Sequence, residues 1–229
     1  MAEQASARPQ VGSQTLARGL RALLVVVDSP DGLTSQQLAV ELGVHRSIAY
    51  RLLQTLVEFG LLTQSADGRY RGGSRLATLA DAYLPALRQL AIPAMREVAN
   101  EIGCTVSLFI AEGAEAVSIE LVEPTTATHH IAFKAGMRTP INRGAAGYAL
   151  LAAGPQVAEE PDEVTRARER GYATSSGEIE VGAYAVAAPI PNSHPRACLN
   201  LITYREDQAT AAEEFILNAA RQVGEALRD

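Results

Sequence analysis

The stretch GVHRSIAYRLLQTLVEFGLL, residues 43–62, decides the fold of the first part of this chain. Apolar residues recur in it at helical spacing, which predicts a helix from about His45 to Phe59 that ends at Gly60. We expect its inward face to consist of Ile48, Leu52, Leu53, Leu56 and Phe59. The outward residues of its first half can all donate hydrogen bonds to phosphates or base edges, and they are His45, Arg46, Ser47, Tyr50, Arg51 and Gln54.

Two further helices are predicted before this stretch. Ser13 is a candidate N-cap for a helix that carries Leu16, Leu20, Leu23, Leu24 and Val27 and ends before Pro30. Thr34 and Gln37 have the spacing of a capping box, which predicts a short helix that ends at Gly43. Residues 1–12 are polar without a period, and we expect a mobile tail there.

A basic hairpin is predicted after the three helices. Asp67-Gly68 is a dipeptide that suits a type I′ turn, and Arg69 and Arg71 then lie on the same side of the returning strand. Three helices followed by such a hairpin are typical of a winged helix-turn-helix, which we place at residues 13–73. The alternative is a small helical domain for protein contacts, with the arginines as ordinary surface charges.

Different roles are expected for the polar residues of this segment. Arg46 and Arg51 are candidates for reading base edges, because a guanidinium can bind guanine in a bidentate way. The candidates for phosphate contacts are Arg18, Thr34, Ser35, Arg69 and Arg71. Tyr50 could equally be a ring that covers the helix surface, and His45 a solvated helix start.

Charge is distributed unevenly along the 229 residues, whose formal net charge is −6. Residues 1–75 hold eight arginines and six acidic residues, a balance of +2, and the rest holds twelve basic and twenty acidic residues, a balance of −8. The acidic total therefore does not exclude a nucleic-acid partner. We expect a cytoplasmic protein without a membrane partner, because no long apolar stretch or signal peptide is present and two cysteines form no disulfide framework.

A linker helix is expected over residues 74–88. Its apolar stripe is longer than a small domain can bury, which favours pairing with a second subunit as a homodimer or a dimer of dimers. Pro85 predicts a bend, and a further helix is expected over about Ile92 to Ile102, with Pro93 early in it.

Strand and helix patterns alternate in residues 89–229, which we take as one α+β domain. Expected strands cover 104–110, 116–122, 129–134, 184–190 and 197–204, and expected helices cover 148–153, 164–170 and 211–227. This grouping favours an antiparallel sheet with flanking helices.

Four blocks in this order resemble the IclR family of bacterial transcription regulators: residues 43–62, 67–84, GMRTPINRGAAGYALLA (136–152) and RERGYATSSGEIEVGAYAVAAPI (168–190). The resemblance covers almost the whole chain. It implies a winged helix-turn-helix, a linker helix and a GAF-like effector domain, with double-stranded operator DNA and a small-molecule effector as partners. The function expected is sequence-specific transcription regulation in which the effector modulates operator affinity.

The resemblance also places an effector pocket. Backbone N–H groups of Ala145 and Ala146 would hold an anionic ligand, although these small residues could instead serve close helix-to-sheet packing. Ser176, Ala185, Asn200 and Ile202 replace polar residues usual in the family, and Tyr148 replaces a lysine. A larger or less polar effector is therefore expected, with Phe133, Ser175, Ser176, Tyr184 and Asn200 as further lining candidates.

The sequence contains no recognisable catalytic, cofactor or metal motif. The sequence has no nucleophile elbow, Walker A loop or H-E-x-x-H pattern, so we expect neither an enzyme nor a cofactor. Adjacent His129 and His130 would face opposite sides of a strand, and Pro195 disfavours a His194/Cys198 pair, so no metal is expected. A remaining alternative is a DNA-binding regulator whose second domain only oligomerises.

Overall fold

Two compact units, residues 1–83 and 84–229, make up the chain in the computed structural model. The structure describes residues 12–125 and 135–228. The expected tail, apart from Gly12, and the expected strand over 129–134 lie outside the described residues.

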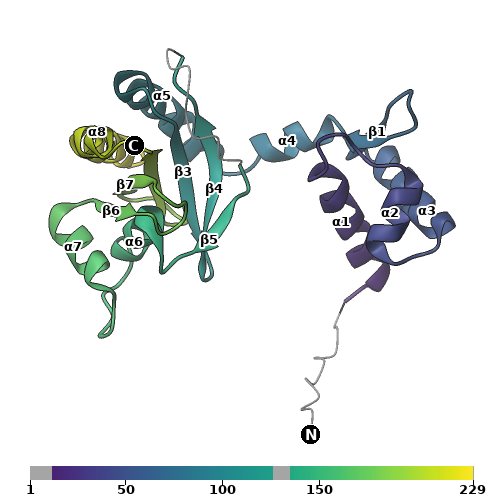
Figure 1. Ribbon diagram of the computed structural model, residues 1–229, viewed down its shortest axis with the longest axis horizontal. Coiled ribbons are helices and arrows are strands. Elements are labelled where there is room, and N and C mark those ends of the chain that lie inside the picture. The colour runs from purple at the N-terminus through teal and green to yellow at the C-terminus, as the bar shows by residue number, and fades with distance from the viewer. Residues whose placement is uncertain (1–11, 126–134, 229) are drawn as a thin grey trace, which may run out of the picture. The chain divides into compact units, whose positions relative to one another are not determined.

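The first unit consists of three helices, a hairpin and a fourth helix (Figure 1): α1 (Gln14–Val27), α2 (Ser35–Leu42), α3 (Arg46–Glu58), β1 (Leu62–Gln64), β2 (Tyr70–Gly72) and α4 (Arg75–Asp81). The side chain of Ser13 caps α1. The capping box at the start of α2 is present, and Gly43 ends that helix with φ 61°. The helix boundaries therefore follow the local signals in the sequence.

The core of this unit is smaller than the helical pattern predicts. Ala22, Leu38, Leu53 and Tyr70 are among its fully buried residues. The expected inward face of α3 was wrong at both ends, because Ile48 is exposed and Phe59 is 67% exposed.

The turn of the hairpin differs from the expected type I′. Gly68 has a positive φ of 76° and Asp67 does not, while the Gly68 N–H donates to the Ser65 carbonyl at 2.9 Å. Type I′ requires positive φ at both central residues, so this is a longer loop that ends in a left-handed glycine. Arg71 lies in β2 and Arg69 directly before it, so both arginines are nevertheless part of the hairpin.

The expected linker helix over 74–88 is also wrong in its length. α4 ends at Asp81, and α5 begins at Pro85 and runs to Ile102, after a left-handed Leu84 with φ 48°. A residue before proline avoids the helical region, which explains the break. Pro93 lies inside α5, and the helix continues through it because the buried side chains of Leu87 and Met95 stabilise it.

The second unit is built on one six-stranded antiparallel sheet of order β5-β4-β3-β8-β7-β6. Its remaining elements are β3 (Val106–Glu112), β4 (Glu115–Val122), β5 (Arg138–Pro140), α6 (Gly144–Ala152), α7 (Asp162–Arg170), β6 (Ala173–Ser176), β7 (Tyr184–Ile190), β8 (Ala197–Thr203) and α8 (Glu206–Ala226). The predicted α+β class, with N-terminal helices and a C-terminal antiparallel sheet with helices, is confirmed.

Alternate residues of the sheet face two separate cores (Figure 1). One core joins α5 and α8 to residues such as Leu108 and Leu199, and the other joins α6 and α7 to Phe109 and Cys198. Burial of each large apolar side chain contributes about 1.5–3 kcal/mol, so both faces are held by packing.

Four elements of this unit, β5, β6, α6 and α8, differ from the expected ones. The short strands β5 and β6 were not predicted, and α8 begins five residues before Ala211. α6 begins at Gly144, so the small residues that were expected to precede the helix form its first turn instead. Within the described residues, no helix has the length and apolar character needed to cross a bilayer.

Candidate functional site

The side chain of His45 caps the N-terminus of α3. The Nδ1 atom of His45 accepts a hydrogen bond of 3.3 Å from the Ser47 N–H and lies 2.8 Å from the Ser47 hydroxyl. This contact satisfies one of the free N–H groups of the helix start. His45 and Ser47 therefore fix the direction of the helix end that carries the exposed arginines.

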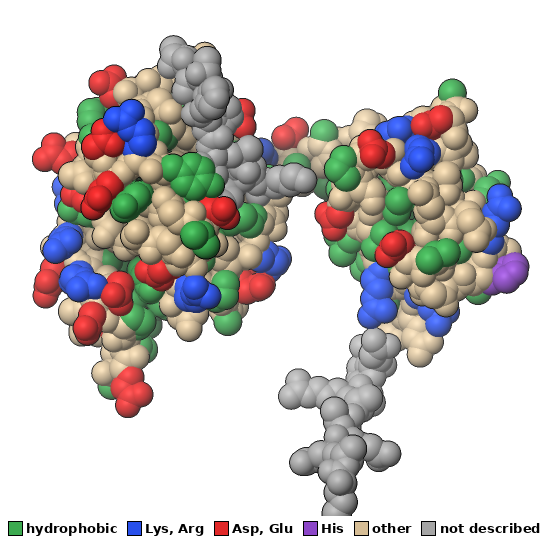
Figure 2. All heavy atoms as spheres, viewed as in Figure 1, with side chains coloured by type: hydrophobic (Ala, Val, Ile, Leu, Met, Phe, Trp, Pro, Cys, Tyr) green, Lys and Arg blue, Asp and Glu red, His purple; other side chains and the backbone are tan. Residues whose placement is uncertain are grey.

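Arg46 and Arg51 are exposed on α3, and neither has a hydrogen-bond or ion-pair partner among the described residues. Arg18 of α1 and Arg51 line the same surface hollow of about 260 Å³, together with Thr15 and Thr55. Basic side chains lie near the single histidine of this unit in Figure 2. Two helices thus present unpaired guanidinium groups at one surface.

Other predicted contact residues already have internal partners. The Gln54 amide donates to the Tyr70 hydroxyl at 3.0 Å, and the Thr34 hydroxyl donates to the Gln37 side chain at 3.0 Å. Ser35 and Tyr50 remain accessible, with Tyr50 half exposed.

The guanidinium groups of the two hairpin arginines, Arg69 and Arg71, donate hydrogen bonds within the first unit. Arg69 donates to the Gly32 carbonyl at 2.9 Å, and Arg71 donates to the Ser65 hydroxyl and to Asp67, the latter at 3.2 Å. The Arg71 hydrogen bond is the main cause that lowers the pKa of Asp67. Both arginines therefore order the hairpin, whether or not they also contact a ligand.

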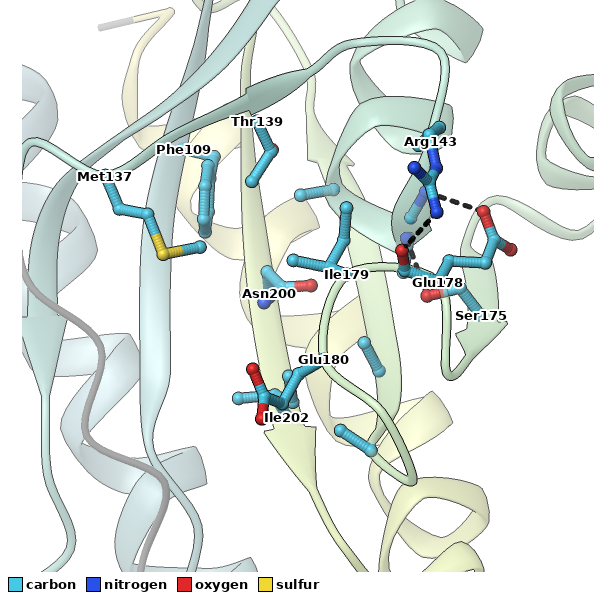
Figure 3. A pocket seen from close by; sticks show the side chains of 15 residues that line it. Phe109, Met137, Thr139, Arg143, Ser175, Glu178, Ile179, Glu180, Asn200 and Ile202 are labelled. Carbon is cyan, nitrogen blue, oxygen red and sulfur yellow. Dashed lines mark hydrogen bonds between the residues drawn. The ribbon is translucent and has the colours of Figure 1, made fainter.

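A cavity lies between the N-terminus of α6, the face of the central strands and the loop 177–182 (Figure 3). Its volume is about 30 Å³, which is enough for a few water molecules at most. Its lining residues are Phe109, Met137, Thr139, Arg143, Gly144, Ala145, Ala146, Ser175, Glu178, Ile179, Glu180, Ala183, Ala185, Asn200 and Ile202.

Ile179 is the residue that narrows this cavity. A Cβ atom on Gly144 would lie only 2.7 Å from its Cγ1, so Ile179 packs directly on the start of α6. Gly177 and Gly182, at the two ends of the loop, have positive φ values of 67° and 77°. Glycines in these positions allow the loop to turn sharply over the cavity.

The first amide groups of α6 bind side chains of the chain itself. The Gly144 N–H donates to Glu178 Oε2 at 3.0 Å, and the Ala145 N–H donates to Ser175 Oγ at 2.9 Å. Tyr148 donates its hydroxyl to the same Glu178 oxygen at 2.6 Å. Burial, followed by the contact with Glu178, raises the pKa of Tyr148 to about 12, so this hydroxyl keeps its proton at neutral pH.

The residues predicted for the effector pocket line two different hollows in the structure. Ala145, Ala146, Ser175 and Asn200 line the cavity together. Ser176 and Tyr184 line a different, wider hollow beside it, to which Ser175 also contributes, and Phe133 lies outside the described residues. Tertiary packing decides this division, because Ser175 and Ser176 point to opposite sides of β6.

Sequence reasoning missed several lining residues. Phe109 and Met137 come from segments that were identified only as a strand and a loop. Glu178 and Ile179 belong to the quoted block 168–190, and their position next to Gly177 was the signal available. Both cysteines are free and buried, and burial raises the pKa of the Cys198 thiol. Among the described residues, no group of three His, Cys, Asp or Glu side chains could hold a metal ion.

Comparisons with known proteins match both units. The IclR helix-turn-helix domain matches residues 15–66, and the family described as bacterial transcriptional regulator IclR C-terminal matches residues 84–161. The DNA-binding transcriptional repressor YiaJ of Escherichia coli is 27% identical over 255 residues, covering 98% of this chain and 89% of that protein. The transcriptional repressor IclR of Escherichia coli is 24% identical, covering 92% and 88%.

A solved structure supports the same assignment. An IclR homologue from Microbacterium hydrocarbonoxydans, complexed with 4-hydroxybenzoate, has a TM-score of 0.80 and 25% identity, covering 94% of this chain and 99% of that one. The curated relatives are regulators rather than enzymes, which supports a non-enzymatic role. With matching domain models in both units and the same fold as a solved homologue, the chain belongs to the IclR family of DNA-binding transcriptional regulators.

Proposed function

We propose that this chain reads operator DNA through α3 and that a small molecule in the cavity of the second unit changes its operator affinity. The observation that carries the proposal is the pair Arg46 and Arg51, exposed on a capped helix and unpaired among the described residues. A bidentate arginine contact to guanine gives roughly 1–3 kcal/mol of discrimination between bases. These two residues are the proposed determinants of sequence preference.

The surrounding polar residues are proposed to position the protein on the DNA backbone. Arg18 shares a hollow with Arg51, and a phosphate there would meet two positive charges. The other proposed contacts are Thr34, Ser35, His45, Ser47, Tyr50, Gln54, Arg69 and Arg71. Among these, Gln54 and Arg69 act partly through the internal hydrogen bonds that hold the hairpin in place.

A dimer is proposed from the apolar surface of the first unit. α1 exposes Leu16, Leu20, Leu24 and Val27, which lie on one side of the helix, and α4 exposes Leu79. Val27 and Leu76 both come within 4 Å of the Cβ position of Gly72, so the two helices contribute to one surface. Apolar patches of this kind mark interaction sites, and a two-fold dimer suits a palindromic operator.

The effector site is proposed at the cavity beside α6. The homologue bound to 4-hydroxybenzoate has the same fold over 94% of this chain, and the residues proposed here are Ala145, Ala146, Ser175 and Asn200. Ser176 and Tyr184, in the neighbouring hollow, and Phe133 complete the proposed set. Because the cavity holds only about 30 Å³, a ligand must displace Ile179, and this displacement is the step that would bias the DNA-binding state.

The small volume of the cavity also favours a second candidate function. A cavity of about 30 Å³, too small for a metabolite as it stands, is what a unit that serves only oligomerisation would have. The two candidates differ in one measurable property, since only a sensor binds a metabolite that changes operator affinity.

DNA recognition is tested by selecting binding sites from a random DNA library and comparing variants on selected and scrambled DNA. We expect Arg51→Ala to reduce the ratio of the two affinities by roughly 5- to 100-fold, and Arg75→Ala to leave this ratio unchanged. Arg75 is also exposed and lies outside α3, so it controls for lost charge. If Arg51→Ala lost the same affinity for selected as for scrambled DNA, the proposed role of Arg51 in sequence recognition would be contradicted.

Effector coupling is tested by a thermal-shift screen of small metabolites, followed by operator titrations with and without each stabilising compound. A true ligand at 100 times its Kd stabilises the fold by about 2.7 kcal/mol. Equal operator affinity of the free and saturated protein at several salt concentrations would favour the oligomerisation alternative.

A further inference from the structure

Asp67 is a charged residue of the hairpin to which the proposed function gives no role. Its Oδ2 accepts a hydrogen bond of 3.2 Å from Arg71 Nη2 and lies 3.9 Å from Arg69 Nε. The hydrogen bond from Arg71 lowers the pKa of this carboxyl, so Asp67 is negatively charged at neutral pH. Its other oxygen accepts from the main-chain N–H of Arg69 at 3.1 Å. One carboxylate therefore lies against both of the arginines that are proposed to contact DNA.

The two arginines are held in different ways. Arg69 donates to the main-chain oxygen of Gly32 at 2.9 Å, a neutral partner in the loop before α2. Arg71 donates to Asp67 and to the Ser65 hydroxyl, which both belong to the hairpin itself. The side chain of Arg71 is 38% exposed and that of Asp67 is 49% exposed. Because exposed ion pairs of this kind contribute little to stability, a competing anion can separate Arg71 from Asp67.

Arg71 lies beside the loop that leads into α2, whose first polar residues are proposed to contact the DNA backbone. The main chains of Leu33 and Tyr70 exchange two hydrogen bonds, of 2.8 and 3.0 Å, which fix the hairpin to this loop. A Cβ atom on Gly32 would lie 2.7 Å from Arg71 Cγ, so the stem of the arginine packs on the same loop. A DNA strand that runs past the start of α2 would therefore bring its phosphates close to Arg71.

We propose that Asp67 competes with DNA phosphates for Arg71 and thereby limits the affinity of this chain for DNA of any sequence. In the free protein the carboxylate holds the guanidinium. On DNA a phosphate takes its place, and the released charge of Asp67 then lies close to the negative backbone. Both effects weaken binding, and neither depends on the bases, because phosphate contacts carry no sequence information. The inference rests on the proposed DNA-binding function and assigns a residue that opposes it.

The test measures the affinity of full-chain variants for selected and scrambled DNA by fluorescence anisotropy at several salt concentrations. Asp67→Asn removes the charge but keeps an oxygen that can accept from the Arg69 N–H, and asparagine suits the same turns as aspartate. We expect this variant to bind both DNAs about two- to fivefold more tightly, with an unchanged ratio of the two affinities. The loss of affinity with salt should become steeper by about one phosphate contact for each subunit.

The expected gain depends on Arg71. Asp67→Asn combined with Arg71→Gln should bind DNA no more tightly than Arg71→Gln alone, whereas Asp67→Asn combined with Arg69→Gln should still bind more tightly than Arg69→Gln alone. Asp31→Asn is the matched control, since Asp31 is exposed next to Gly32 and has no arginine partner among the described residues. It removes the same charge and should change the affinity for DNA by less than about twofold.

Three results would overturn the inference: an unchanged DNA affinity of Asp67→Asn, a gain that persists without Arg71, or an equal gain in Asp31→Asn, which would mean a general effect of charge. Each of them can occur in a protein that binds its selected DNA and needs Arg51 to recognise it, so only the inference would fail. A wild type that binds no DNA would contradict the proposed function together with the inference, which makes the two failures distinguishable.

Discussion

The side-chain amide of Gln54 donates a hydrogen bond of 3.0 Å to the hydroxyl of Tyr70, and this contact joins α3 to β2 of the hairpin. Tyr70 is buried in the core of the first unit, and its backbone pairs with Leu33 in the loop before α2. The position of the hairpin relative to α3 therefore depends on the buried ring of Tyr70 and on its hydroxyl group.

Tyr70→Phe is predicted to lower the free energy of unfolding by about 0.5–1.5 kcal/mol, because it removes the acceptor of the Gln54 amide. Urea denaturation measures this loss. Tyr50→Phe removes a hydroxyl from an exposed ring and should leave stability unchanged. If the two variants unfold at the same urea concentration, the Gln54–Tyr70 contact does not contribute to stability.

Leu24→Glu is predicted to shift the proposed dimer to a monomer, since it places a charge in the apolar surface that α1 exposes. Light scattering after size-exclusion chromatography gives the mass of each variant. Val40→Glu introduces the same charge at an exposed residue of α2 and should leave the mass unchanged. Dimers of unaltered stability in Leu24→Glu would exclude α1 from the interface.

Arg168→Ala is predicted to destabilise the second unit by about 2 kcal/mol or more, because charged hydrogen bonds to main-chain carbonyls are among the stronger ones. Its guanidinium donates to carbonyls at the end of α6, among them Ala152 at 2.6 Å and Gly154 at 2.8 Å. Arg166→Ala, on the same helix, breaks an exposed pair with Glu163 and should change stability by less than about 1 kcal/mol. Thermal or urea unfolding compares the two variants, and equal losses would contradict this role of Arg168.

The hydrogen bond between Arg168 and Glu160 predicts that the stability of the second unit depends on pH. This hydrogen bond lowers the pKa of the Glu160 carboxyl from its usual value near 4.5. A carboxyl with a lowered pKa in the folded state stabilises the fold above its unfolded pKa, and this contribution is lost as the pH falls through the folded value. Unfolding measured from pH 7 to pH 3 should show a steeper loss for the wild type than for Arg168→Ala. Parallel curves would mean that the pair is not linked to folding.

Gly144→Ala is predicted to destabilise the second unit by more than Gly113→Ala. Both glycines have positive φ, of 76° and 61°, which costs an alanine roughly 1–2 kcal/mol. Only the Cβ at residue 144 meets another side chain, that of Ile179 at 2.7 Å. Denaturation of the single variants and of Gly144→Ala with Ile179→Ala checks this, because the double variant should recover the difference. Without such recovery, the contact with Ile179 is not the cause.

Much of the helical framework could be predicted because its signals are local. Ser13, Thr34 with Gln37, and Gly43 mark helix ends in the sequence, and the structure uses each of them. The break before Pro85 was predicted from the proline itself, whereas the start of α5 as early as Pro85, with Pro93 in its interior, was not, since it depends on what each helix face packs against. The type of the hairpin turn was also missed, because Asp67 and Gly68 fit more than one turn geometry.

The candidate sites also combine features that local sequence signals determine with features that depend on tertiary packing. The sequence by itself determined which residues lie on α3, because the helical period and the glycines that flank the helix are local signals. Only the tertiary structure decided which of the polar residues near them have internal partners, as Gln54 and Arg69 do. It also decided that Glu178, more than thirty residues beyond Gly144, occupies the start of α6. Local hydrogen bonding sets helix ends and faces, whereas the contents of a cavity depend on strands and loops that meet only when the sheet has formed.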